Sequence, residues 1–199
     1  MKGLLLKDLY LIKTVCRTNI LCVVLFAVVS VFSEENMFFL FFPCIIASML
    51  PITLLSYDER DKWTEYALTL PCTRAQLVSG KYIIGLLGIV SAVLLNVLAQ
   101  AFFGSYPRAE LAVLSAVMLS VGLLGPAVLY PLIFKFGIEK GRLFYYIFIG
   151  AACASIMILS NKAQSIRAGG SVYLLPIAGA VLYAVSWLLS IRLYESRRK

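Results

Sequence analysis

The chain has 199 residues, of which 61% are hydrophobic and 14% charged, with a net charge of +8 and a mean hydropathy of +0.92. A soluble domain of this length is nearer half apolar, so the surplus is expected to face lipid and a separate soluble domain is excluded. The sequence has no histidine, and its five cysteines lack metal-ligand or redox spacing, so the commonest general base and metal sites are absent as well.

The N-terminal segment, residues 1–14, mixes leucines with charged residues. Leu5, Leu9 and Ile12 fall at the i, i+4, i+7 positions of a helix. This spacing predicts an amphipathic helix that lies in the membrane interface. No small-residue cleavage site follows the next apolar run, so we expect this segment to be retained rather than removed as a signal peptide.

The remaining sequence predicts six membrane-spanning helices, because a span needs about 20 apolar residues. The predicted spans are residues 15–32, 37–57, 82–103, 109–134, 143–160 and 172–191. Pro43 and Pro51 are expected to kink the second span. Pro126 and Pro131 are expected to make the later half of the fourth span irregular. The predicted fold class is all-α: a polytopic membrane protein with a single membrane domain over residues 1–199.

The distribution of Lys and Arg predicts the orientation. Fifteen of the 18 basic residues lie in the segments 1–17, 58–81, 135–142 and 192–199, and three lie in the intervening turns. Basic residues gather on the cytoplasmic side of membrane proteins. Both termini and the segment 58–81 are therefore predicted to be cytoplasmic, and the protein to be a multi-pass protein of the cell membrane.

The segment 58–81 is the longest polar stretch, and residues 58–65 contain four acids and two bases. If residues 59–69 are helical, Trp63, Tyr66 and Leu70 form an aromatic and apolar stripe beside a charged one. Such a helix can rest on lipid headgroups or dock in a groove of another protein. An anionic inner leaflet does not attract clustered acids, so a protein partner is at least as well supported as a lipid surface.

The motifs around this segment form a distinctive set. Lys7-Asp8-Leu9 precedes the first span, and Tyr57-Asp58-Glu59-Arg60-Asp61, Leu68-Thr69-Leu70-Pro71-Cys72-Thr73-Arg74 and Gly80-Lys81-Tyr82 follow the second. The set resembles the permease subunits of type-2 ABC exporters in their short, six-span form. Chain length and span order extend the resemblance to the whole sequence. Within the family, a looser resemblance is to the permeases of phenol-soluble modulin peptide exporters.

The resemblance implies a partner and a site. In such exporters the helix after the second span is a coupling helix, seated on a separate ATP-hydrolysing subunit that binds ATP and Mg. Carried over by position, the coupling residues are Asp58, Glu59, Arg60, Asp61, Trp63, Glu65, Tyr66 and Leu70. A second cytoplasmic contact is implied at Gly137, Glu139, Lys140 and Arg142. The expected assembly is two permeases, as a homodimer or with a close paralogue, and two ATPases, in the lipid bilayer and without nucleic acid.

This chain is not expected to be an enzyme or to hold a cofactor. The nearest candidate for a phosphate-binding loop, residues 75–82, lacks the first glycine and the final hydroxyl that such a loop needs. An intramembrane enzyme would need paired carboxylates, a histidine cluster or a nucleophilic dyad at depth, and the predicted spans have no Asp, Glu, Lys, Arg or His in their central turns. Mid-membrane ionisable groups are typical of proton-coupled and ion-coupled transporters, so the energy is expected to come from outside the bilayer.

The third predicted span carries small and amide side chains on one face, ending in Asn96 and Gln100. This face could line a translocation path or a dimer seam. Ordinary helix packing with interhelical hydrogen bonds is the alternative, and is favoured on the residue types alone.

Two functions remain in competition. The first is an ABC permease that exports an amphipathic peptide or another hydrophobic cargo. The second is a passive channel, or an accessory or immunity subunit, without ATP coupling. An acid-rich amphipathic helix between spans favours the first, because a channel has no need of one.

Overall fold

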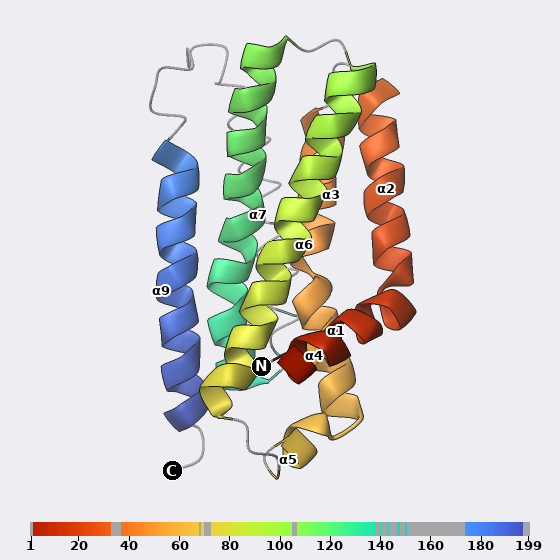
Figure 1. Ribbon diagram of the computed structural model, residues 1–199. Helices are drawn as coiled ribbons and strands as arrows, with labels where there is room; N and C mark the ends of the chain where they lie inside the picture. The colour runs from red at the N-terminus through yellow and green to blue at the C-terminus, as the bar shows by residue number, and fades with distance from the viewer. Residues whose placement is uncertain are drawn as a thin grey trace.

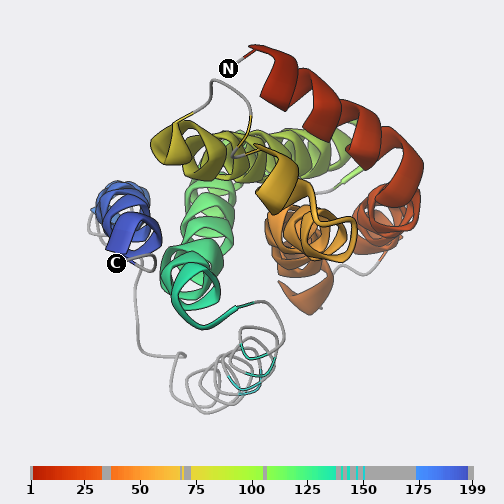
Figure 2. The ribbon, with the colours of Figure 1, turned by 90° about the horizontal axis from the view of Figure 1, so that it is seen from below.

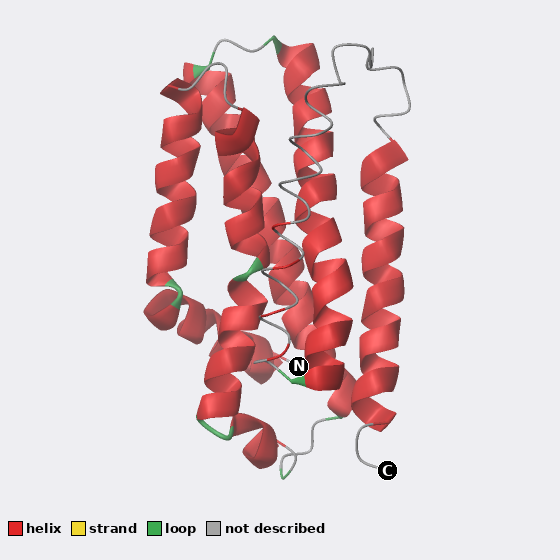
Figure 3. Ribbon diagram, turned by 180° about the vertical axis from the view of Figure 1, so that it is seen from behind, coloured by secondary structure: helices red, strands yellow, loops and turns green. Residues whose placement is uncertain are grey.

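The computed structural model describes residues 2–32, 37–67, 69, 73–104, 107–137 and 174–196, together with the helical residues Lys140, Leu143, Ile147 and Gly150. Every regular element in these residues is an α-helix (Figures 1 and 3). In chain order the helices are α1 (Lys2–Val15), α2 (Arg17–Phe32), α3 (Met37–Ser48), α4 (Leu50–Arg60), α5 (Trp63–Ala67), α6 (Arg74–Phe103), α7 (Arg108–Phe136) and α9 (Leu174–Ser196).

Four helical stretches among the described residues are long and apolar enough to cross a membrane. They are Phe39–Arg60, Arg74–Phe103, Glu110–Phe136 and Leu174–Tyr194, and the bent pair α1–α2 is a fifth if it is counted as one span. The prediction of an all-α polytopic membrane protein is confirmed. The predicted span 143–160 lies almost wholly outside the described residues, so the count of six stays a prediction.

Helix α1 lies across one end of the bundle, as seen from below in Figure 2. It meets α2 at an angle of 69°, and Cys16 lies buried at the bend. Leu6, Leu9 and Tyr10 are exposed, whereas Asp8 is buried. The predicted apolar face is therefore divided: Leu9 is exposed, whereas Leu5 and Ile12 pack against a buried cluster that includes Leu54 and Ile84. The place of α1 in a membrane interface stays a prediction.

Helices α3 and α4 together form one span with a break at Met49. Pro51 stands in the first turn of α4. A backbone N–H at that position would have no partner within the helix, so the proline costs α4 no hydrogen bond. Gly88 of α6 lies against this break, where a Cβ would come within 3.0 Å of Leu50 Cδ1 and 3.5 Å of Ala47 O. The interruption predicted near Pro51 is thus present, and the glycine of α6 makes room for it, whereas α3 continues through Pro43 without a break.

Two predicted boundaries need correction. Residues 74–81 are not loop but the first turns of α6, because Thr73 and Gln76 form a reciprocal capping box at its start. The later half of α7 was expected to be irregular, but α7 is one helix through Pro126 and Pro131 to Phe136. Prolines are tolerated in membrane helices where neighbouring groups satisfy the freed carbonyls.

An aromatic cluster joins α6, α7 and α9. Tyr82 makes edge contacts with Tyr130 and Tyr183, at centroid distances of 4.9 and 5.2 Å, and stacks on Trp187 at 5.6 Å. The hydroxyl of Tyr183 donates to the carbonyl of Tyr82 at 2.7 Å. Gly85 lies beside this cluster, and a Cβ there would be 2.6 Å from the hydroxyl oxygen of Tyr130. Close approach of these three helices therefore depends on a residue without a side chain.

We expect Gly85→Ala to lower the free energy of unfolding by about 1–3 kcal/mol, because overpacking a filled core displaces its neighbours. The matched control is Gly80→Ala on the same helix, where a Cβ meets nothing within 4 Å. Thermal or denaturant unfolding in detergent measures both variants. Equal stability of the two would show that the aromatic cluster adjusts without cost.

Candidate functional site

The segment that follows α4 is a turn and a short helix rather than one continuous coupling helix. The amide of Asp61 donates to Tyr57 O at 2.9 Å and closes α4. Lys62 then adopts a φ of 53°, in the left-handed region, and α5 begins at Trp63. The continuous helix considered for residues 59–69 is therefore not formed, because an α-helix cannot continue through a residue in the left-handed conformation.

The two aromatic residues of the predicted stripe still lie together, on the short helix α5. Trp63 and Tyr66 lie on α5 with ring centroids 5.4 Å apart. Tyr66 is 58% exposed, and Trp63 is half-buried. Leu70 and the side chain of Glu65 lie outside the described residues.

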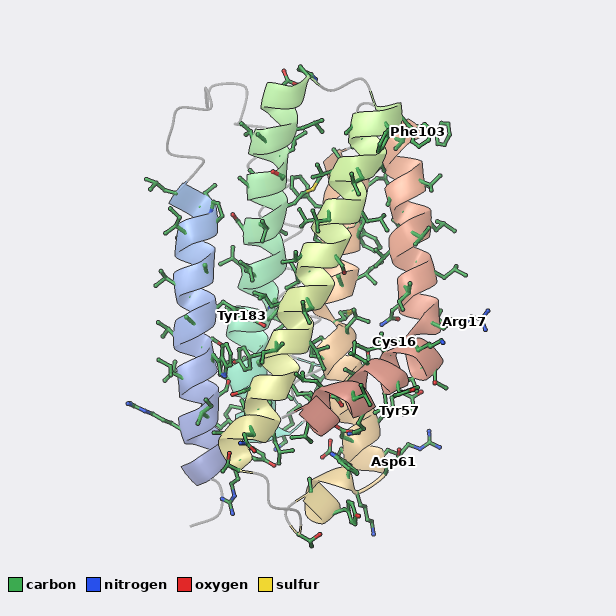
Figure 4. The ribbon with its side chains drawn as sticks, in the orientation of Figure 1. Cys16, Arg17, Tyr57, Asp61, Phe103 and Tyr183 are labelled. Atoms are coloured by element: carbon green, nitrogen blue, oxygen red, sulfur yellow. The ribbon has the colours of Figure 1, made fainter. Side chains whose placement is uncertain are left out.

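The predicted coupling residues divide into an exposed set and a buried one. Glu59, Arg60 and Asp61 are exposed at the end of α4. Figure 4 shows Asp61 at the end of the molecule that holds α1, far from Phe103 at the other end. Asp58, by contrast, is only 5% exposed. Asp58 therefore points into the molecule, where it contacts Lys7 and Lys81, two residues distant from it in the sequence.

Asp58 belongs to a buried ion cluster of two lysines and two aspartates. Lys81 Nζ lies 2.7 Å from Asp58 Oδ2 and 2.8 Å from both carboxylate oxygens of Asp8. Lys7 Nζ bonds to Asp58 Oδ1 and lies 3.5 Å from Asp8 Oδ1. The contacts form a closed ring of alternating charge. Lys7 and Asp8 are on α1, Asp58 is on α4 and Lys81 is on α6, so the ring joins three helices.

The balance of charge makes this cluster tolerable at such low exposure. The side chains of Asp8, Asp58 and Lys81 are 5%, 7% and 8% exposed, and that of Lys7 is 24% exposed. A buried charge is strongly unfavourable unless it is paired and hydrogen-bonded, and every member here has two opposite charges beside it. Lys7 also lies over the ring of Trp63, 4.1 Å from its centroid, which adds a cation–π contact to α5.

Sequence reasoning missed this cluster as a unit. Lys7-Asp8 and Gly80-Lys81 were singled out only as pieces of a family pattern, and Asp58 was assigned to an exposed helix. The pairs join residues 51 and 73 positions apart, which no helical periodicity connects. A signal was available for two of the four residues: Asp58 and Lys81 stand near the ends of long apolar helical stretches, where an unpaired charge is costly.

The second predicted contact is described only in part. Gly137 ends α7 with a φ of 89°, and its amide donates to Ile133 O at 2.9 Å. Lys140 is exposed. Glu139 and Arg142 lie outside the described residues.

Asn96 and Gln100 face α2 of the same chain. Asn96 is fully buried, with Oδ1 3.2 Å from Ser30 Oγ, and Gln100 Nε2 donates to Ser30 O at 3.1 Å. This is the geometry of helix packing through interhelical hydrogen bonds. A part in a translocation path or in a seam between two copies stays a prediction.

Among the described residues, no group of His, Cys, Asp and Glu is arranged to hold a metal ion. What the ion cluster can do is hold α1, α4 and α6 in a fixed relation beside the exposed end of α4 and α5.

We expect Lys81→Met to destabilise the protein by about 3–5 kcal/mol, because it leaves two buried carboxylates with one lysine. The double variant Asp8→Asn with Lys81→Met should recover most of that loss, since the remaining Lys7–Asp58 pair is balanced. Unfolding of the purified chain in detergent measures both. If the double variant were no more stable than the single one, charge balance would not be the stabilising factor.

Comparison with known proteins identifies a family. No curated protein and no solved structure matches the chain. The family model described as "ABC-2 family transporter protein" matches residues 3–195, which is nearly the full length and extends from the first described helix to the last. The chain therefore belongs to the ABC-2 transporter family, as a multi-pass membrane protein of the permease type.

Proposed function

We propose that this chain is the permease subunit of an ATP-driven exporter and that its ATPase partner docks on the exposed surface formed by the end of α4 and by α5. Family membership supports a permease and its association with an ABC ATPase. ATP and Mg would be bound and ATP hydrolysed on the partner, and this chain would be non-catalytic.

The observation that carries the docking site is the exposed surface at the turn between α4 and α5. Glu59, Asp61 and Tyr66 are exposed there, and α5 projects beyond the helices of the bundle (Figure 1). An aromatic anchor flanked by charges fits a groove on a protein partner, where an aromatic residue supplies much of the binding energy. Asp58 would position this surface from below rather than touch the partner.

The distribution of charge supports a cytoplasmic position for this end. The exposed basic residues include Lys13 on α1, Arg17 at the start of α2, Lys135 in the last turn of α7 and Arg192 near the end of α9. These ends of α2, α7 and α9 lie at the end of the bundle that holds α1 and α5 (Figure 1). The far end, where α6 is joined to α7, carries Arg108. By the positive-inside tendency, the first end would face the cytoplasm and receive a cytoplasmic ATPase.

The proposed cargo is an amphipathic peptide or another hydrophobic molecule, moved out of the cell between two copies of this chain or between it and a close paralogue. Each chain exposes wide apolar faces, with Leu21 of α2, Leu94 and Leu98 of α6 and Leu188 of α9 among them. Such faces suit contact with lipid, with a second permease or with an apolar cargo. The resemblance to small peptide exporters favours a peptide.

Purification of the tagged chain from its native membrane in mild detergent tests the docking site. We expect an ATPase subunit in stoichiometric amount and at least about tenfold less of it with Tyr66→Ala, since truncating a central anchor residue typically costs about 2 kcal/mol or more, and tenfold corresponds to about 1.4 kcal/mol. Phe103→Ala is the matched control, because Phe103 is an exposed aromatic residue at the opposite end. A chain that purifies alone and supports no ATP hydrolysis would instead be a passive channel or an accessory subunit.

Reporter fusions test the orientation. A reporter attached after Lys199 should be active only in the cytoplasm, and one inserted between Ser105 and Tyr106 should be active only outside the cell. The reverse pattern would place α5 on the outer side and remove the proposed access of a cytoplasmic ATPase.

A further inference from the structure

The buried ion cluster is placed between the proposed docking surface and the rest of the bundle. Asp58 lies two residues before the end of α4, and Lys81 lies in the early turns of α6. The chain between them runs out through the turn and α5 and returns. The bond between Lys81 and Asp58 therefore closes the base of the segment that carries α5.

The same cluster fastens α1 to this base. Asp8 binds Lys81, and Lys7 binds Asp58, so α1 is held to both sides of the closure. Lys7 also contacts the ring of Trp63, which gives α5 itself a direct contact with α1. Figure 2 shows α1 passing beside the ends of α4 and α6.

We propose that the cluster of Lys7, Asp8, Asp58 and Lys81 is the joint that transmits movement of α5 to α1 and α6. This inference rests on the proposed function, because it assumes that an ATPase moves α5. The four residues are positioning residues: they do not touch the partner, and they determine that α1, α4 and α6 respond together.

The physical reason is the closed arrangement of charge. Separating any one of the three helices from the ring leaves buried charges without their partners, which is strongly unfavourable. Concerted displacement of all three keeps every pair intact. A push on α5 is therefore expected to displace α1 with α4 and α6 rather than to slide one helix past the others.

Hydrogen–deuterium exchange on the permease–ATPase complex tests the joint without attached labels. Exchange is followed in α1, residues 2–15, and in α5, residues 63–67, without nucleotide and after trapping with ADP and vanadate. In the parent complex, trapping should change the exchange rate of α1 amides at least about fivefold, the lower end of ordinary coupling free energies.

Lys7→Met with Asp58→Asn removes one balanced pair and releases α1 both from α4 and from the Trp63 ring of α5. In this variant the ATPase should still protect α5, but the response of α1 to trapping should be lost. The matched control, Arg108→Gln with Glu110→Gln, also removes one basic and one acidic residue, at the other end of the molecule. It should keep the full response of α1.

Each other outcome counts against a stated proposal. If the ATPase does not protect α5 in the parent complex, the docking site itself is wrong. If α5 is protected but α1 does not respond to trapping, or if α1 responds equally in the double variant, the joint is refuted while docking stands. Should this double variant fail to accumulate, Asp8→Asn with Lys81→Met removes the other balanced pair and releases α6 from α1. Exchange is then followed in the first turns of α6, residues 74–81, which should lose the response to trapping that they show in the parent complex. An equal response there would refute the joint.

Discussion

Pairing of buried charge is the constraint on which this structure depends. A membrane helix can carry an ionisable residue near its end only if the residue reaches water or an opposite charge. Here two lysines and two aspartates from α1, α4 and α6 satisfy one another in a closed ring. The position of α1 across the end of the bundle follows from that ring. So does the position of α5, since its two flanking helices are joined at their base.

A second, neutral set of contacts fixes the other side of the bundle. Tyr82 shares its hydroxyl with Ser186 and Ser190 of α9, at 2.8 and 2.6 Å. Trp187 Nε1 donates to Ser79 Oγ at 3.0 Å. Aromatic rings supply contact area, and the serines satisfy their polar ends without introducing charge. Tyr82 directly follows Lys81, so consecutive residues of α6 anchor the helix to α1 and α4 on one side and to α9 on the other.

Hydropathy predicted well where the helices lie in the sequence, but it did not predict which helices contact one another. Long apolar runs gave the approximate positions of α2, α6, α7 and α9, because lipid imposes composition along the whole length of a span. The first turns of α6 were missed because residues 74–81 are polar enough to resemble a loop, although Thr73 and Gln76 form a capping box.

The candidate site shows the same division between local and distant signals. Exposure of Glu59, Asp61 and Tyr66 could be expected from the local sequence. Burial of Asp58 could not, because it depends on Lys7 and Lys81, which reach it only after α1 and α6 have packed. The resemblance to a family implied an ATPase partner, but it also implied that Asp58 lies on the contact surface with Glu59 and Asp61.

The unbroken length of α6 has a mechanical consequence. Lys81 and Gln100 lie 19 residues apart on this one helix, which at 1.5 Å per residue is about 28 Å along its axis. A helix of this length acts as a lever: a tilt of about 10° with Lys81 as the pivot displaces Gln100 by about 5 Å. The hydrogen bond between Gln100 and Ser30, now 3.1 Å long, is lost once its donor and acceptor are about 3.6 Å apart, so a displacement of that size away from α2 breaks it. A small rotation among the charges at one end of α6 is thus sufficient to part it from α2 at the other.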